Sequence, residues 1–334
     1  MRKNFFKKII SSREFYLLTI ILVIIAVIGI RSDNFFKPQN IQGLILSISV
    51  YSIIVSVLTV VFISGGFDIS IGSVFSTAGV VLGICFNKGV PVYLAIIITI
   101  LMGVIVGASI GLFVTKVGLS PFVTTLAYFY IFFGMSWYLG FIGFERSAYV
   151  TPVFGDFPES FLRIATGKFL GIEYIAYYMV AIVIILQILM VKNVFFRQSY
   201  YIGANELSAR VIGIKVNIVK IFNYTLVSTF VAIAAVLRAS NVGATIPGLA
   251  GLSFPLTMIA AVILGGGSLE GGTGSITGSI LGVILITLLN NAMVMLGVNP
   301  YYNNLFLGLI LLISILIDRY IKGFRFTRIK RVKV

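Results

Sequence analysis

The chain has 334 residues, of which 59% are hydrophobic and 10% are charged, and its net charge at pH 7 is +15. A mean hydropathy of +1.10 lies far outside the range of soluble globular domains, so the sequence indicates an integral membrane protein. Histidine is absent and Cys85 is the single cysteine, which excludes disulfides within the chain, Cys/His metal sites and catalysis by histidine.

Apolar stretches of nearly membrane-spanning length follow one another along the chain. A helix needs roughly 20 apolar residues to cross a hydrocarbon core about 30 Å thick. Because backbone polar groups must be satisfied inside lipid, α-helices are the expected form of these stretches. The sequence therefore predicts an all-α, polytopic membrane protein of about ten transmembrane helices, near residues 15–30, 41–63, 71–86, 90–112, 121–142, 172–191, 219–238, 252–266, 274–297 and 300–318.

The basic residues are distributed unevenly between the two sides of the membrane. Clusters at 1–14, 192–220 and 319–333, together with Lys116, hold most of the 25 lysines and arginines and share one side if ten spans alternate. By the positive-inside rule, we expect the N-terminal segment 1–14, the loop 192–218 and the tail 319–334 to be cytoplasmic. Because these residues flank membrane spans, no nucleic-acid partner is expected. The first span is expected to remain uncleaved, since no small-residue cleavage site follows it.

A glycine-rich turn that carries an acid interrupts the apolar sequence at residues 63–74, "ISGGFDISIGSV". A charged acid at membrane depth costs about 2.5–3.5 kcal/mol on insertion scales, so Asp68 needs shelter or a place near the interface. The sequence favours a cap, in which Asp68 or Ser70 accepts hydrogen bonds from the first amides of the helix that starts near Ile71. A direct contact of Asp68 with a passing solute is the alternative.

A second stretch of this kind, "GGGSLEGGTGSITGS" at 265–279, carries Glu270. In both stretches the acid stands four residues before a Gly-Ser-aliphatic triplet, which indicates a weak internal repeat. Broken segments in matching halves of a transporter point to its transport path. No lysine follows these glycines as a Walker loop requires, so nucleotide binding is not expected. The glycines expected to shape the two turns are Gly65, Gly66, Gly72, Gly266, Gly267 and Gly274.

Polar side chains within or beside the spans are few. Interhelical hydrogen bonding is the favoured role for the asparagines among them. The candidates for a translocation path or gate are Asp68, Ser70, Asn241, Glu270, Asn290 and Asn291.

The cytoplasmic loop 192–218 contains a short amphipathic segment, "ANELSARVIGI". Glu206 and Arg210 are spaced as an i,i+4 ion pair, which is worth a few tenths of a kcal/mol, and Gly213 ends the helical pattern. A helix on the membrane surface and a docking helix for a soluble partner both fit this pattern. On the other face, the loop 143–171 is long enough to receive a docking protein.

Five motifs occur in one order along the chain: "SGGFDISIGSV", "GLSPFVTTLA", "GANELSARVIGI", "AAVILGGGSLEGGTGSITGSILG" and "LLNNAMVMLGVNPYY". Together they make the chain resemble the membrane permease subunit of bacterial ABC sugar importers, the ribose/xylose/autoinducer-2 group. The likeness runs from about residue 15 to about residue 320.

The resemblance implies a single permease domain, 1–334, that forms the path for a sugar or sugar-like solute in the bacterial inner membrane. It implies an extracytoplasmic sugar-binding protein, cytoplasmic ATPase subunits that use ATP and Mg, and a second permease, either a copy or a paralogue. Such a chain is not itself an enzyme. The motif at 203–213 matches the family's coupling helix, but one of its two usual acids is absent here. The residues implied to contact the ATPase are Asn205, Glu206, Ala209, Arg210 and Gly213.

Two other classes of function fit the sequence less well. An ion-coupled secondary transporter would need an ionisable group in mid-membrane, whereas Asp68 and Glu270 map to the cytoplasmic edges. A membrane enzyme would need a nucleophile and base or a metal cluster, and the sequence offers no candidate for a catalytic or metal-binding residue.

Overall fold

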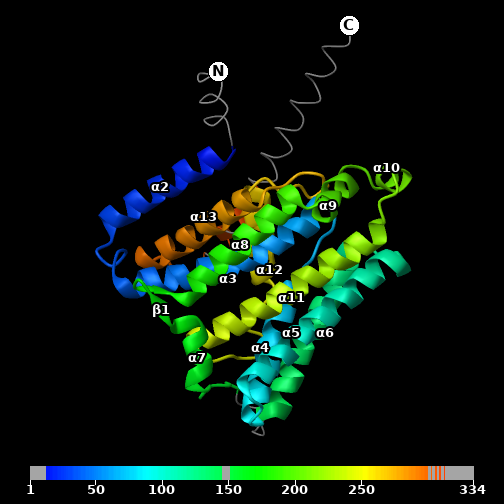
Figure 1. Ribbon diagram of the computed structural model, residues 1–334. Helices are drawn as coiled ribbons and strands as arrows, with labels where there is room; N and C mark the ends of the chain where they lie inside the picture. Colours follow the sequence, from blue (N-terminus) through cyan, green and yellow to red (C-terminus); the bar gives the residue numbers. More distant parts are fainter. Residues whose placement is uncertain are drawn as a thin grey trace.

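The computed structural model describes residues 13–144 and 151–299, together with 302, 305, 306, 308, 309 and 312. The described part is a bundle of α-helices with one short hairpin (Figure 1). Its elements are α2 (Arg13–Arg31), α3 (Pro38–Ile63), α4 (Ile71–Asn87), α5 (Val92–Leu112), the π-helical turn η1 (Phe113–Val117), α6 (Pro121–Phe144), α7 (Glu159–Thr166), β1 (Lys168–Phe169), β2 (Ile172–Glu173), α8 (Tyr174–Lys192), α9 (Val194–Ala204), α10 (Glu206–Val211), α11 (Val216–Val242), α12 (Ser253–Leu264) and α13 (Ile276–Met295).

Every predicted span from 15–30 to 274–297 coincides with a helix, but the helices differ in reach. Among the described residues, 7 helices are long and apolar enough to cross a membrane, whereas α4 and α12 are shorter. With 12 residues, α12 covers about 18 Å, less than the hydrocarbon core, so a full span at 252–266 is not confirmed. The predicted span 300–318, the tail 319–334 and most of segment 1–14 lie outside the described residues.

Helix α3 forms the centre of the bundle. Nearly all of its second half, from Ser49 to Ile63, is buried, and it packs against α8, α11, α12 and α13. The hydroxyls of Ser56 and Thr59 donate to carbonyls one turn earlier, at 2.6 and 2.7 Å, so these buried polar groups are satisfied within the helix.

Helices α5 and α11 approach each other closely along a stripe of small residues. A Cβ placed on Gly103 or Gly107 would lie 2.6 or 2.5 Å from a backbone carbonyl oxygen of α11. Inside lipid, close packing of this kind holds helices together, because the surrounding acyl chains are as apolar as the side chains. The stripe therefore fixes α11, the helix that carries Tyr224 and Arg238.

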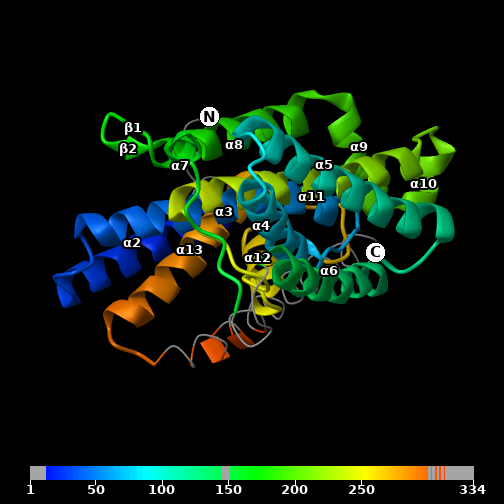
Figure 2. The same cartoon turned by 90° about the horizontal axis from the view of Figure 1, so that it is seen from below.

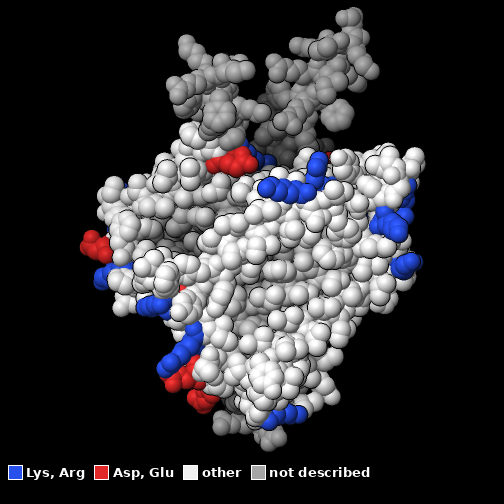
Figure 3. All heavy atoms as spheres, in the orientation of Figure 1, with Lys and Arg blue, Asp and Glu red and all other residues white. Residues whose placement is uncertain are grey.

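Two groups of short elements lie at opposite ends of the long helices. Helix α10 lies at one end, and α7 with the β1–β2 hairpin lies at the other (Figures 1 and 2). The predicted external loop 143–171 is thus largely structured, although residues 145–150 lie outside the described part. Between the two ends, the face seen in Figure 3 has a broad middle without visible charged side chains, as expected for a surface in contact with lipid.

The segment 243–252, between α11 and α12, is mostly irregular and runs along α4. The amides of Gly248 and Ala250 are held by the hydroxyls of Ser136 and Ser76, at 3.2 and 2.9 Å. Non-helical backbone is tolerated at membrane depth when protein groups satisfy it in this way. Sequence reasoning missed this break and placed broken backbone only at the two glycine-rich turns.

Candidate functional site

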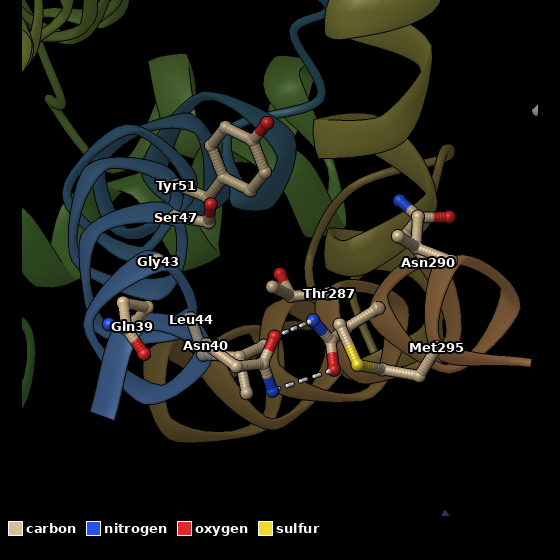
Figure 4. Close-up of a pocket in the computed structure, with 11 residues that line it drawn as sticks. Gln39, Asn40, Gly43, Leu44, Ser47, Tyr51, Thr287, Asn290 and Met295 are labelled. Carbon is tan, nitrogen blue, oxygen red and sulfur yellow. Dashed lines mark hydrogen bonds between the residues drawn. The ribbon is translucent and has the colours of Figure 1, made fainter. Parts of the chain in front are cut away.

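A polar pocket of about 300 Å³ lies between the first turns of α3 and the last turns of α13 (Figure 4). We call it the vestibule. It lies at the end of the bundle that carries the β1–β2 hairpin (Figure 1). Within the described part of the chain, its polar lining is entirely neutral and consists of Gln39, Asn40, Ser47, Tyr51, Thr287, Asn290 and Asn291.

A pair of asparagines joins the two helices of the vestibule. Asn291 donates to the side chain of Asn40 at 2.6 Å, and Asn40 donates back at 3.3 Å (Figure 4). Asn40 also donates to the carbonyl of Phe35 at 2.7 Å, which fixes the start of α3. Asn291 therefore makes an interhelical bond, whereas Asn290 lines the vestibule outside this pair.

Thr287 forms part of the wall of the vestibule. Its Oγ1 is closed off from solvent and has no hydrogen-bond partner among the described residues. Leaving such a group unsatisfied costs about 1–3 kcal/mol. A solute hydroxyl would offset this cost only after a movement of the wall exposes Oγ1.

Three aromatic rings in contact with one another begin at Tyr51, which lines the vestibule, and we call them the aromatic floor. Tyr51 from α3 meets Phe254 from α12 edge to face, with ring centroids 5.6 Å apart. Phe254 stacks in turn on Phe75 from α4, at 5.1 Å. Because the rings come from three different helices, a relative movement of those helices would open or close the floor.

Behind the aromatic floor lies a cation that sequence reasoning missed. Arg238 on α11 is partly buried beside Phe75, Gly79 and Thr245, and its guanidinium interacts electrostatically with Tyr51. It is the single charged residue between Lys220 and Glu270. That isolation within a predicted span was the signal that could have identified it, because an ionisable residue in a membrane segment is a functional candidate by default.

The other path candidates lie away from the vestibule. Asn241 donates to Glu173 at 2.7 Å and ties the end of α11 to the hairpin. Glu270 lies exposed on the turn after α12, at the opposite end of the bundle from the vestibule. Of the predicted set, the structure places only Asn290 and Asn291 at the vestibule.

Asp68 and Ser70 are fully buried in the turn between α3 and α4. One carboxylate oxygen, Oδ1, accepts hydrogen bonds from the amide and the hydroxyl of Ser70, at 2.8 and 2.6 Å. The amide belongs to the residue before the helix, and Ser70 makes no side-chain cap bond, so the expectation that either residue caps the first helical amides was wrong. The other oxygen of Asp68, Oδ2, is buried without a hydrogen-bond partner among the described residues.

The glycine-rich turns meet each other and the end of α9. Gly271 lies so close to Gly65 that a Cβ on it would be 2.8 Å from the Gly65 backbone. A Cβ on Gly203 of α9 would be 2.4 Å from the amide nitrogen of Gly272. Gly65 and Gly266 have φ angles of 71° and 101°, in the region that favours glycine.

The remaining glycines of the predicted set lie at close contacts. Added Cβ atoms on Gly66, Gly72, Gly267 and Gly274 would meet neighbouring atoms within 3 Å.

The predicted segment 203–213 forms a compact unit built on α10. It follows a helix, α9, that the sequence did not predict. Asn205 caps α10 by accepting from the amide of Ser208 at 2.8 Å. Ala209 is buried and anchors the helix against α9 and α11, and Gly213, with a φ of 86°, allows the chain to turn back.

Glu206 is held by two cations. Arg210, four residues on, lies 2.8 Å away as predicted, and Lys220 from α11 lies 2.5 Å away. Partial burial acts to raise the pKa of Glu206, but the hydrogen bonds and charges of Lys220 and Arg210 outweigh it and hold the pKa below its ordinary value. These bonds fix α10 so that Leu207, Val211 and Ile212 face outward, with 77, 87 and 67% of their surfaces exposed.

Known proteins match the chain over most of its length. A family model described as "Branched-chain amino acid transport system / permease component" matches residues 40–315. The ribose import permease protein of Bacillus subtilis is 34% identical over 299 residues, with 90% of each chain covered. The corresponding protein of Haemophilus influenzae is 30% identical over 313 residues, with 94% of each chain covered.

A relative with a different named solute matches equally broadly. The galactose/methyl galactoside import permease protein of Escherichia coli is 29% identical over 312 residues, which are 90% of this chain and 92% of that protein. No solved structure matches the chain. The family match, the relatives and the apolar helices agree: the chain belongs to the family of branched-chain amino acid transport system permease components, as a non-catalytic membrane permease subunit of the ABC importer type.

Proposed function

We propose that this chain forms the path by which a neutral sugar crosses the bacterial inner membrane. The observation that carries this proposal is the vestibule, whose described polar lining offers amide and hydroxyl groups without a charge. Such groups can both donate and accept hydrogen bonds, as a sugar's hydroxyls require. The relatives named for ribose and galactose import support the same class of solute.

The family description raises a branched-chain amino acid as another solute. An amino acid carries an ammonium and a carboxylate, and a site for it needs charges or helix ends that pair with both. No charged side chain lines the vestibule in the described part of the chain. This neutral lining favours the sugar.

The energy for transport is proposed to come from a cytoplasmic ATPase that uses ATP and Mg and docks on α10. The outward-facing Leu207, Val211 and Ile212 supply an apolar contact of the kind that anchors interfaces. A movement of α10 would reach the spans through α9, because Gly203 touches both glycine-rich turns. ATP drives the cycle only if the ATPase binds the two permease states with different affinity.

The remaining partners complete the proposed assembly. An extracytoplasmic sugar-binding protein would deliver solute on the side of α7 and the hairpin, near the vestibule. A second permease, identical or paralogous, would pair with this chain in the bilayer. In this orientation both termini are cytoplasmic, and 1–334 acts as one permease domain.

Reconstitution with the ATPase and the binding protein tests the proposal. Uptake of radiolabelled ribose, galactose and leucine into proteoliposomes is measured with and without ATP. We expect ATP-dependent uptake of a sugar and none of leucine. ATP-dependent leucine uptake, or sugar uptake driven by a sodium or proton gradient without ATP, would contradict it.

A further inference from the structure

We propose that Arg238 is a specificity-determining residue of the solute path: its positive charge behind the aromatic floor excludes cations while neutral solutes pass. The inference rests on the proposed function in one respect, namely that the vestibule is the entrance of the path. It adds a selection by charge that the neutral lining of the vestibule cannot make by itself.

The position of Arg238 supports the proposal. It lies one turn before the end of α11, at the end of the bundle where the vestibule opens. Phe75 belongs both to the aromatic floor and to the surroundings of Arg238, and the guanidinium of Arg238 interacts electrostatically with Tyr51. The cation therefore lies next to the aromatic floor, past which we place the solute path.

The charge of Arg238 is not neutralised within the described part of the chain. None of the ion pairs found there includes it, and none of the side chains around it is an acid. Arg238 lies near the end of α11 but is partly buried among apolar side chains, where a charge without a partner is unfavourable. A cation kept there without an ion pair among the described residues indicates a use for its charge.

The physical effect follows from the low polarisability of the surroundings. A fixed positive charge between apolar helices acts over a longer distance than it would in water, and charged side chains beside narrow pores act as barriers to ions of the same sign. The hydroxyls of a neutral sugar meet no such barrier. A path that opened for a sugar would otherwise let sodium ions or protons leak through.

Cation leak through the reconstituted importer tests the proposal. The chain is placed in liposomes with its ATPase and supplied with ATP but no sugar. A potassium gradient with valinomycin sets a membrane potential, and dyes report the entry of sodium ions and protons. The variants are Arg238→Gln, Arg238→Glu and Arg238→Lys. Arg163→Gln is the control, because Arg163 lies exposed on α7 in a surface pair with Glu159.

We expect leak to rise on the order of tenfold in Arg238→Gln and further in Arg238→Glu, with Arg238→Lys and the control at the wild-type level. Wild-type tightness in both the Gln and Glu variants would overturn the proposal. So would equal leak in the Gln and Lys variants, since the shape of the guanidinium and not its charge would then matter.

The thermal unfolding midpoint of Arg238→Gln distinguishes a structural role of Arg238 from a role in charge selection. Arg238→Gln removes no ion pair of the described residues, so we expect a midpoint no lower than that of the wild type. A clearly lower midpoint would assign Arg238 to the support of the fold and overturn the proposal. Because the leak assay contains no sugar, a failure of the sugar-uptake experiment would not be mistaken for a failure of this one.

Discussion

The amide of Gly272 donates a hydrogen bond of 2.9 Å to the carbonyl of Ile63, so the two glycine-rich turns are joined although they lie far apart in the sequence. Gly203, near the end of α9, packs onto this same hydrogen bond. The junction therefore connects the helix before α10 with the ends of α3 and α12. It is one route from the proposed ATPase surface to the spans, beside the direct contact of α10 with α11.

The junction makes Gly203 sensitive to a single methyl group. A Cβ in Gly203→Ala would lie 1.9 Å from the Ile63 carbonyl oxygen, so α9 must move away from both turns. We expect a loss of about 1–3 kcal/mol in stability, with ATP hydrolysis retained and uptake strongly reduced. Gly134→Ala on α6 is the matched control, because its Cβ would meet nothing within 4 Å. Uptake at the control's level in Gly203→Ala would rule out this route of coupling.

A reversed charge at Glu206 tests the docking helix. In Glu206→Lys, three cations would face one another at α10, because Arg210 and Lys220 both bind the carboxylate. We expect the protein to insert normally but to bind the ATPase weakly, so that ATP hydrolysis is uncoupled from uptake. We expect Gly213→Pro likewise to insert and to uncouple hydrolysis from uptake. Glu159→Lys, which breaks an exposed pair on α7, is the control for a change of charge. Normal uptake in both Glu206→Lys and Gly213→Pro would show that α10 is not the coupling helix.

The lowered pKa of Glu206 gives its pair a defined pH dependence. Because the folded-state value lies below the ordinary one, the pair stabilises the fold above the ordinary carboxyl range, and this contribution disappears as the pH falls through the folded-state value. We expect the unfolding midpoints of wild type and Glu206→Gln to differ most at pH 7 and to approach each other as the pH falls below the ordinary carboxyl value. A difference that does not shrink on acidification would contradict this account.

The buried Asp68 is expected to act on folding. Asp68→Ala leaves the amide and the hydroxyl of Ser70 without their acceptor, which we expect to cost about 1–3 kcal/mol and to lower the folded yield in membranes. Asp68→Asn keeps a carbonyl oxygen in the same place and should have the smaller effect. A lower transport rate in Asp68→Asn at unchanged yield would instead favour a contact with the solute.

Replacing Thr287 distinguishes an effect on transport from an effect on stability. Thr287→Val keeps the shape but removes a buried group that has no described partner, so stability should be unchanged or higher. If the hydroxyl bonds the sugar, the KM for uptake rises by up to about tenfold. Thr229→Val on α11, which removes a satisfied hydroxyl, should leave the KM unchanged. An unchanged KM in Thr287→Val would remove Thr287 from the solute path.

The spans were predictable because hydropathy over about 20 residues is a strong local signal, and the Glu206–Arg210 pair because i,i+4 spacing is local as well. The contact of the two glycine-rich turns was not predictable, since a repeat indicates similar structures and not adjacent ones. Helix α9 was missed because polar residues at 197–199 interrupt its apolar sequence, so the stretch was interpreted as part of a loop between spans. Arg238 was overlooked because it belongs to an otherwise apolar span. Its proposed role depends on rings from α3, α4 and α12 that only the fold brings near it.

The irregular segment 243–252, which precedes the short helix α12, can change in sequence without disturbing a helix. Because 243–252 is held mainly by hydroxyls of α4 and α6 and by a bridge to Phe154, no helical hydrogen-bond ladder has to be broken to reshape it. Exchanges in this ten-residue wall can alter the space beside Arg238 while the helices keep their packing. Relatives that carry different sugars could thus diverge in this wall first and retain a common scaffold.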